Sequence, residues 1–190
     1  MHRLTATAVA FFAVAASAAA QTASDLREQL QSTLDSMTAA VLAADGDAYL
    51  EHVAVDEPEF RVEQIAWAND LSRITPFIIA YDMVSEPEIN EKGDAIVDLV
   101  IVWNTPNREG QNRGIEIPAR FVWDNESNSW DFGGRAWEEI DTEGLRVMYV
   151  DGNSGVARDV VAVWPDIKEH VEDGFEFQLD HPQVVKLYPS

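Results

Sequence analysis

The sequence predicts an α+β fold, in which three helices precede a curved antiparallel sheet and a partial α/β unit follows. Between residues 24 and 71, apolar residues recur at intervals of three and four, which is the helical period. Between residues 75 and 137 the period changes to two, which is typical of strands with one buried face. Because helices and strands are segregated here, the helices are expected to pack on one face of the sheet.

Three helices are expected over residues 24–44, 47–53 and 58–71. The first carries a single apolar face, made by Leu26, Leu30, Leu34, Met37 and Val41. Asp47 is expected to cap the second helix, because an aspartate side chain accepts hydrogen bonds from the free N–H groups of a first turn. Pro58 suits the first turn of the third helix, where no backbone N–H is needed.

Four strands are expected next, over residues 77–84, 95–103, 115–123 and 130–137. A polar turn separates each strand from the next, which favours antiparallel hairpins.

A different pattern begins near residue 142 and predicts the opening of a second unit. A strand is expected over residues 145–150, a helix over 156–171 and a last strand over 184–188. This order is typical of an α/β unit, but residues 142–190 are too few to close a core of their own. We therefore interpret residues 21–141 as one domain and residues 142–190 as the start of a truncated second domain.

Residues 1–20 have the organisation of a secretory signal peptide. His2 and Arg3 give a charged start, Leu4 to Ala16 is apolar, and Ala18-Ala19-Ala20 fits the A-x-A cleavage pattern. The apolar run is shorter than the roughly 20 residues that a membrane-spanning helix needs. The sequence therefore predicts export to the periplasm or the extracellular space, with no membrane anchor after cleavage.

The chain is strongly acidic, with 34 acidic residues, 13 basic residues and a formal net charge of −21. A field of this sign repels nucleic acids and anionic membranes, so neither is expected as a partner. The acidic residues are spread through every segment, which favours a solvated surface over a cation-binding cluster. The sequence has no cysteine, which excludes disulfides and thiolate metal sites. No metal or cofactor is expected.

Four residues are candidates for acid–base chemistry. Asp98 and Asp82 each interrupt a largely apolar strand, and a buried carboxyl with a raised pKa can act as a general base. Tyr81 could donate a hydrogen bond to the same site. His52 stands four residues before Asp56, so the two could form a dyad on one helical face. For each candidate, an exposed side chain on an acidic surface is the competing interpretation.

Six tryptophans are many for this length. Trp67, Trp103 and Tyr81 are candidates for lining a ligand cavity between the helices and the sheet. Large aromatic side chains also fill hydrophobic cores, so both interpretations stay open.

Two segments carry a resemblance to a known superfamily. Val41 to Leu50, VLAADGDAYL, resembles the junction of the first two helices in nuclear transport factor 2-like (SnoaL-like) domains. The hairpin FVWD…WDF, from Phe121 to Phe132, resembles the last strand pair of those domains. The resemblance covers about residues 22–140 and implies a cone-shaped α+β domain whose sheet wraps the first helix. It implies no particular function, because the superfamily serves many unrelated roles.

The stretch from Trp130 to Ser190 is similar to certain secreted bacterial proteins. Its motifs are GGRAW at residues 133–137, GLRV at 144–147 and VWPDI at 163–167. In those proteins an accessory domain precedes a gluzincin-like (peptidase MA-like) metallopeptidase domain. The H-E-x-x-H motif of such peptidases is absent from this sequence, so a catalytic part is expected only beyond residue 190.

The sequence favours a non-catalytic, exported binding or accessory domain that positions a peptide or a downstream peptidase-like domain. One alternative is a small enzyme of the same fold, an isomerase or hydrolase with a buried aspartate as its base. Another alternative is a secreted protein that holds an apolar ligand. The sequence indicates no oligomeric state.

Overall fold

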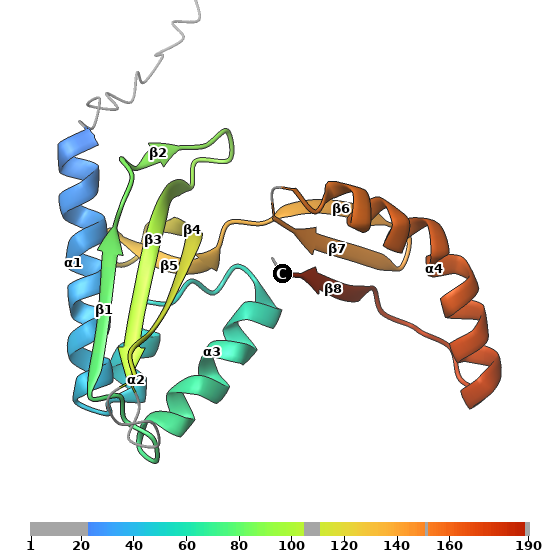
Figure 1. Cartoon of the computed structure of the whole chain (residues 1–190), viewed down its shortest axis with the longest axis horizontal. Helices are drawn as coiled ribbons and strands as arrows, with labels where there is room; N and C mark the ends of the chain where they lie inside the picture. The colour runs from blue at the N-terminus through green and yellow to red at the C-terminus, as the bar shows by residue number, and fades with distance from the viewer. Residues whose placement is uncertain (1–22, 105–110, 151, 189–190) are drawn as a thin grey trace, which may run out of the picture.

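The computed structural model describes residues 23–104, 111–150 and 152–188. The predicted signal peptide, residues 1–20, lies outside the described residues, so export stays a prediction. The described chain confirms the α+β class, with four helices and two separate sheets (Figure 1). None of the described helices is long and apolar enough to cross a membrane.

The elements follow one another along the chain with short connections. They are α1 (Ala23–Leu42), α2 (Gly46–Leu50), α3 (Pro58–Leu71), β1 (Ile78–Met83), β2 (Glu88–Ile89), β3 (Ala95–Asn104), β4 (Arg113–Asp124), β5 (Ser129–Arg135), β6 (Glu138–Thr142), β7 (Leu145–Tyr149), α4 (Ser154–Phe175) and β8 (Gln183–Leu187).

The first sheet is antiparallel, in the order β1-β3-β4-β5, with the short β2 paired to β3. It curls into a half-barrel, and both of its outer strands, β1 and β5, contact α1. The apolar face of α1 is fully buried in this curl, with Leu30, Leu34 and Val41 at 0% exposure. This face packs against the sheet and forms part of the hydrophobic core of the first unit.

Successive residues of β1 and β3 point to opposite faces of the sheet. Met83 pairs with Leu99 at one end of the concave face, and Ile79 pairs with Trp103 at the other end. Met83 and Leu99 are buried in the core that contains the apolar face of α1. The end with Trp103 faces α3, of which only Ala68 and Leu71 are buried.

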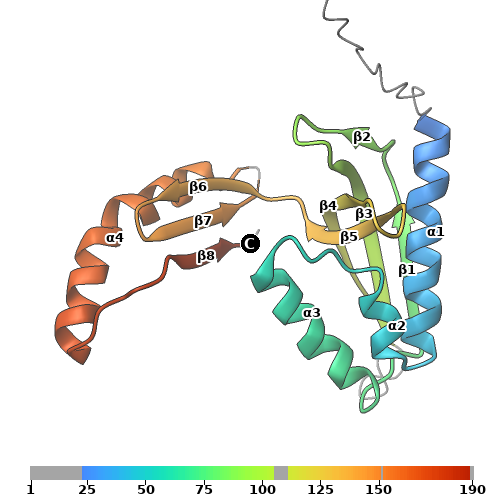
Figure 2. The same cartoon turned by 180° about the vertical axis from the view of Figure 1, so that it is seen from behind.

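The second sheet has the order β6-β7-β8 and lies to one side of the first (Figures 1 and 2). β7 and β8 are parallel and joined by α4, which packs on the sheet through Ala157. The sheet begins at Glu138, before the boundary expected at residue 141. The strand β6 escaped sequence analysis because Glu138–Thr142 contains only one apolar residue.

One capping prediction is wrong. Asp45, not Asp47, caps α2, because the side chain of Asp45 accepts a hydrogen bond from the Ala48 backbone N–H at 3.0 Å. The helix begins at Gly46, which places Asp47 inside its first turn. Gly46 is required there, because a Cβ at this position would lie 2.7 Å from the Ala68 carbonyl oxygen on α3.

Candidate functional site

A cavity of about 580 Å³ lies between α3 and the concave face of the first sheet. Its wall is mainly aromatic and includes Tyr49, Phe60, Trp67, Tyr81, Trp103 and Phe132. Cavities of about 300–1,000 Å³ with apolar walls and a few polar groups are typical of small-molecule sites. This cavity is therefore the candidate functional site.

The floor of the cavity is formed by paired residues of β1 and β3. Ile79 is opposite Trp103, and Tyr81 is opposite Ile101, so all four side chains share the concave face. Helix α3 forms the other wall with Phe60 and with residues one and two turns further along. The space persists because α3 is held at its ends rather than packed along the strands.

Several contacts hold α3 over the cavity. Arg61 Nη1 donates hydrogen bonds to the carbonyl oxygens of Leu50 and Val53, at 2.8 and 2.9 Å. The Phe60 ring lies against Gly134, where φ is +79° and an added Cβ would come within 2.5 Å of the ring. A side chain at residue 134 would therefore push this end of α3 away from the sheet.

Two tyrosine hydroxyls supply hydrogen-bonding groups to the cavity. Tyr49 donates a hydrogen bond of 2.6 Å to Gln64 Oε1, and its ring lies 4.7 Å from that of Trp67. Tyr81 is 8% exposed and lines the same cavity from β1. Burial raises the pKa of both phenols, so both are protonated and uncharged at neutral pH. A protonated phenol can both donate and accept a hydrogen bond, so Tyr81 is a neutral polar group in the wall of the cavity.

The mouth of the cavity carries two carboxylates, both from α3. Lys186 Nζ on β8 lies 2.7 Å from Glu63 Oε1, which joins the second unit to the wall of the cavity. Arg73 Nη1 lies 3.4 Å from Asp70 Oδ1. Both carboxylates are about half exposed or more, at 51% and 61%.

The structure brings Trp67, Trp103 and Tyr81, the candidates for lining a ligand cavity, to the wall of this one cavity, and their role in binding stays a prediction. Their aromatic character and their positions in a helix and two strands were the available signal. Tyr49, Phe60 and Phe132 were missed, because a single aromatic residue in an apolar segment does not indicate whether it faces a cavity or a filled core.

The two candidate general bases are not in the cavity. Asp82 and Asp98 are both exposed on the convex face of the sheet, opposite to the face that carries Tyr81. The side-chain alternation of a strand places neighbours such as Tyr81 and Asp82 on opposite faces. Neither carboxylate can therefore act on a molecule that occupies the cavity, and the expectation of a buried base at these positions is corrected.

The dyad of His52 and Asp56, considered as one possibility, is not formed. Asp56 is held by Arg120 through two hydrogen bonds of 2.8 and 3.1 Å. His52 lies beyond α2, where its carbonyl oxygen accepts a hydrogen bond of 2.8 Å from the Phe132 N–H. Its segment runs along β5, away from the acid.

A second, polar cavity of about 480 Å³ surrounds Arg120 and includes residues of both sheets. Arg120 lies 3.1 Å from Glu57 and 3.5 Å from Asp94, in addition to its bonds with Asp56. Its side chain is 13% exposed. Since the cluster pairs one cation with three anions that hold the start of α3 against β4, its evident role is structural. Sequence analysis missed it, because its members are far apart in the chain.

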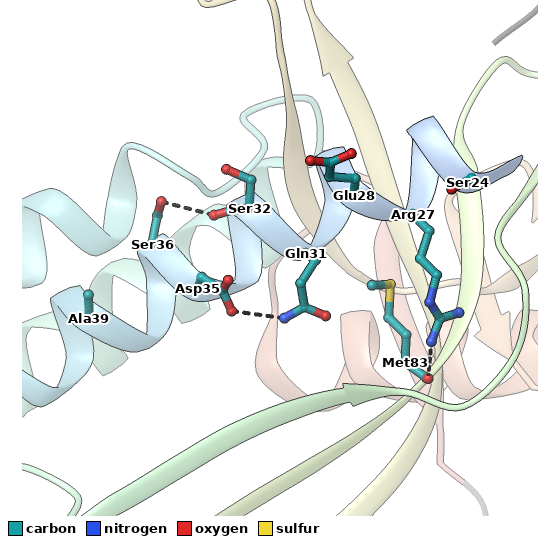
Figure 3. Close-up of a pocket in the computed structure, with 9 residues that line it drawn as sticks. All are labelled: Ser24, Arg27, Glu28, Gln31, Ser32, Asp35, Ser36, Ala39 and Met83. Carbon is teal, nitrogen blue, oxygen red and sulfur yellow. Dashed lines mark hydrogen bonds between the residues drawn. The ribbon is translucent and has the colours of Figure 1, made fainter. Parts of the chain in front are cut away.

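A larger but open depression, about 770 Å³, follows the outer face of α1 (Figure 3). Several of its polar side chains bind one another or the backbone. Gln31 donates to Asp35 at 2.8 Å, and Arg27 donates to the Met83 carbonyl oxygen at 2.7 Å. Because the depression is open to solvent and has few apolar side chains in its wall, it is a weaker candidate than the aromatic cavity.

In the part of the chain that the structure describes, no group of three or more His, Asp or Glu residues is arranged to hold a metal ion. No protein-family model matches the chain, and no curated protein is similar to it in sequence. The geometry of the aromatic cavity is therefore the basis for the function proposed below.

Proposed function

We propose that this chain is an exported, non-catalytic binding protein that holds a small, mainly apolar molecule in the aromatic cavity. The observation that carries the proposal is the cavity itself, about 580 Å³ in volume and walled by six aromatic side chains. Side chains in protein interiors are close-packed, and the atoms that line an empty space lose van der Waals contacts. A ligand would restore those contacts.

The polar groups of the cavity suit binding better than catalysis. The Tyr81 side chain is 8% exposed and uncharged at neutral pH, and the Tyr49 hydroxyl is already bonded to Gln64. A general base would need a carboxylate or a histidine within reach of the ligand. The carboxylates of the wall, Glu63 and Asp70, are at the mouth and are paired with cations. This arrangement disfavours the small-enzyme alternative.

The cone-shaped layout of nuclear transport factor 2-like domains agrees with this proposal. The half-barrel sheet contacts α1 through β1 and β5 and leaves an interior beside α3. An interior of this kind can serve as a ligand pocket, although the layout by itself specifies no ligand.

A second candidate function is favoured by the second sheet. Its parallel strands β7 and β8 are joined by α4, and the outer edge of β8 has no partner strand among the described residues. An open edge can pair with another strand. This geometry agrees with an accessory domain that positions a peptide or precedes a peptidase-like domain.

Filling the cavity tests the proposed function. The uncharged dye N-phenylnaphthylamine becomes fluorescent in apolar sites, and we expect the wild-type protein to bind it saturably. Ile101→Trp places a large ring in the cavity from its floor and should abolish binding without lowering the thermal midpoint. The matched control is Val100→Trp, the same substitution on the convex face of the same strand. Undiminished dye binding by Ile101→Trp would refute the proposal.

A further inference from the structure

Helix α3 presents a stripe of acid, tryptophan and acid to the aromatic cavity. Glu63, Trp67 and Asp70 follow one another at intervals of four and three, so they lie on one face of the helix, and all three line the cavity. The two carboxylates are separated by two helical turns, about 10 Å along the axis. The Trp67 indole therefore lies between two negative charges.

The ionisable side chains of the wall have one sign. Among the described residues that line the cavity, they are Glu63, Asp70 and the two protonated phenols, with no lysine, arginine or histidine. An anionic ligand would meet two carboxylates on this wall, and the cations paired with them, Lys186 and Arg73, do not line the cavity. The net charge of −21 adds a field that concentrates cations and repels anions.

The two carboxylates can still receive a ligand. Lys186 bonds only Oε1 of Glu63, and Arg73 bonds only Oδ1 of Asp70. Both members of the Arg73–Asp70 pair are exposed, so water and salt weaken it, whereas in the other pair Glu63 is 51% exposed and Lys186 is 14% exposed. A ligand cation at the mouth can therefore share or replace these partners.

The rings beside this stripe suit a cation as well. The Tyr49 and Trp67 rings are 4.7 Å apart and inclined at 56°, so they form a corner with two π faces. The negative face of an indole attracts ammonium groups more strongly than other aromatic faces do. The Tyr81 oxygen can accept a hydrogen bond from an N–H group deeper in the cavity.

We infer that the ligand of this cavity is an organic cation, with an apolar body among the rings and an amine or ammonium group over Trp67, between Glu63 and Asp70. This inference rests on the proposed function, because it assigns a ligand class to the same cavity. Aromatic faces and carboxylates act together on the cation, whereas an uncharged molecule of the same shape gains only the apolar contacts.

Three probes with one apolar body test the inference. Phenylbutylamine, phenylbutanol and phenylvalerate carry an ammonium, a hydroxyl and a carboxylate on the same phenylbutyl group, and each is titrated by calorimetry. We expect the amine to bind about tenfold more tightly than the alcohol, and the carboxylate to bind most weakly. The preference for the amine should decrease at high salt.

Variants of Glu63, Trp67 and Asp70 test whether these residues cause the preference for the amine. Glu63→Gln and Asp70→Asn should each weaken amine binding several-fold and leave alcohol binding unchanged, and Trp67→Leu should weaken the amine more than the alcohol. The matched controls are Asp82→Asn and Asp98→Asn, which remove the same charge from the convex face. These controls should leave all three affinities unchanged.

Two results would overturn the inference. The first is that the alcohol binds as tightly as the amine. The second is that Glu63→Gln and Asp70→Asn reduce the preference for the amine over the alcohol no more than the control variants do. If the dye and the alcohol bind but the amine has no advantage, only the ligand class is wrong. If the dye and all three probes fail to bind, the proposed function is wrong too.

Discussion

Arg120 offers the sharpest test of how the first unit is held together. It lies on β4 and contacts Asp56 and Glu57, which precede α3, as well as Asp94, which precedes β3. Replacement by methionine keeps much of the aliphatic part of the side chain. It removes the one cation that is paired with these three acids among the described residues. The Arg120→Met variant therefore leaves three carboxylates close together at a site with little solvent.

The magnitude follows from burial. The Asp94 side chain is 12% exposed, that of Glu57 is 21% exposed, and that of Asp56 is 42% exposed. Removal of one partner from a buried ion pair costs about 3–5 kcal/mol, and the exposure of Asp56 reduces this to about 2–4 kcal/mol. For a chain of this length, about 3 kcal/mol corresponds to a decrease of about 6–12 °C in the thermal midpoint.

The penalty should also depend on pH. Burial raises the pKa of Glu57, and Arg120 opposes this rise, so its removal raises that pKa further. An acid whose pKa is raised in the folded state favours the folded state most when it is protonated, and loses this benefit as pH rises through the folded pKa. The destabilisation by Arg120→Met should therefore be largest near pH 7 and should shrink as pH falls toward the usual carboxyl range.

Urea unfolding at several pH values measures this penalty. Arg73→Met is the matched control, because it breaks an ion pair of which both members are well exposed, at 77% and 61%. Arg73→Met should lower the free energy of unfolding by less than about 1 kcal/mol. Equal costs for the two variants, or a cost for Arg120→Met that grows in acid, would refute the reasoning about this cluster.

Three further changes test the core and a buried acid. Leu34→Ala, at a site with 0% exposure, should lower the free energy of unfolding by about 3–5 kcal/mol in urea titrations. Thr33→Val removes a buried 2.7 Å hydrogen bond to the Trp130 carbonyl oxygen and should lower the free energy of unfolding by about 1–2 kcal/mol. An unchanged free energy of unfolding would contradict this prediction. Burial, with a contribution from Asp124, raises the pKa of Asp131, so its charge opposes folding at neutral pH. Asp131→Asn should therefore stabilise the protein slightly at pH 7 but not in acid, and equal effects at both pH values would contradict this.

The regular elements were predictable because their signals are local. The apolar period of three and four places α1, and the expected bounds of the third helix, 58–71, are those of α3. The long strands β1, β3 and β4 follow from alternation and from the polar turns between them. The short β2 and the polar β6 carry no such pattern, because their pairing with neighbours rather than their composition makes them strands.

The cavity was only partly predictable. Trp67, Trp103 and Tyr81 stood out as aromatic residues in predicted elements, but the contributions of Tyr49 and Phe132 depend on tertiary packing. The choice of Asp82 and Asp98 failed because interruption of an apolar strand does not indicate which face the interrupting residue takes. The alternation around Asp82 did contain that information, since Tyr81 and Met83 are both buried.

The central claim is that the aromatic cavity holds one small, mainly apolar molecule. Calorimetric titration of the wild-type protein with phenylbutanol at several temperatures tests this claim most directly. We predict one site per chain, a negative heat-capacity change from the burial of apolar surface, and loss of the site in Ile101→Trp but not in Val100→Trp. Absence of saturable binding, or the same binding in Ile101→Trp as in the wild type, would contradict the claim.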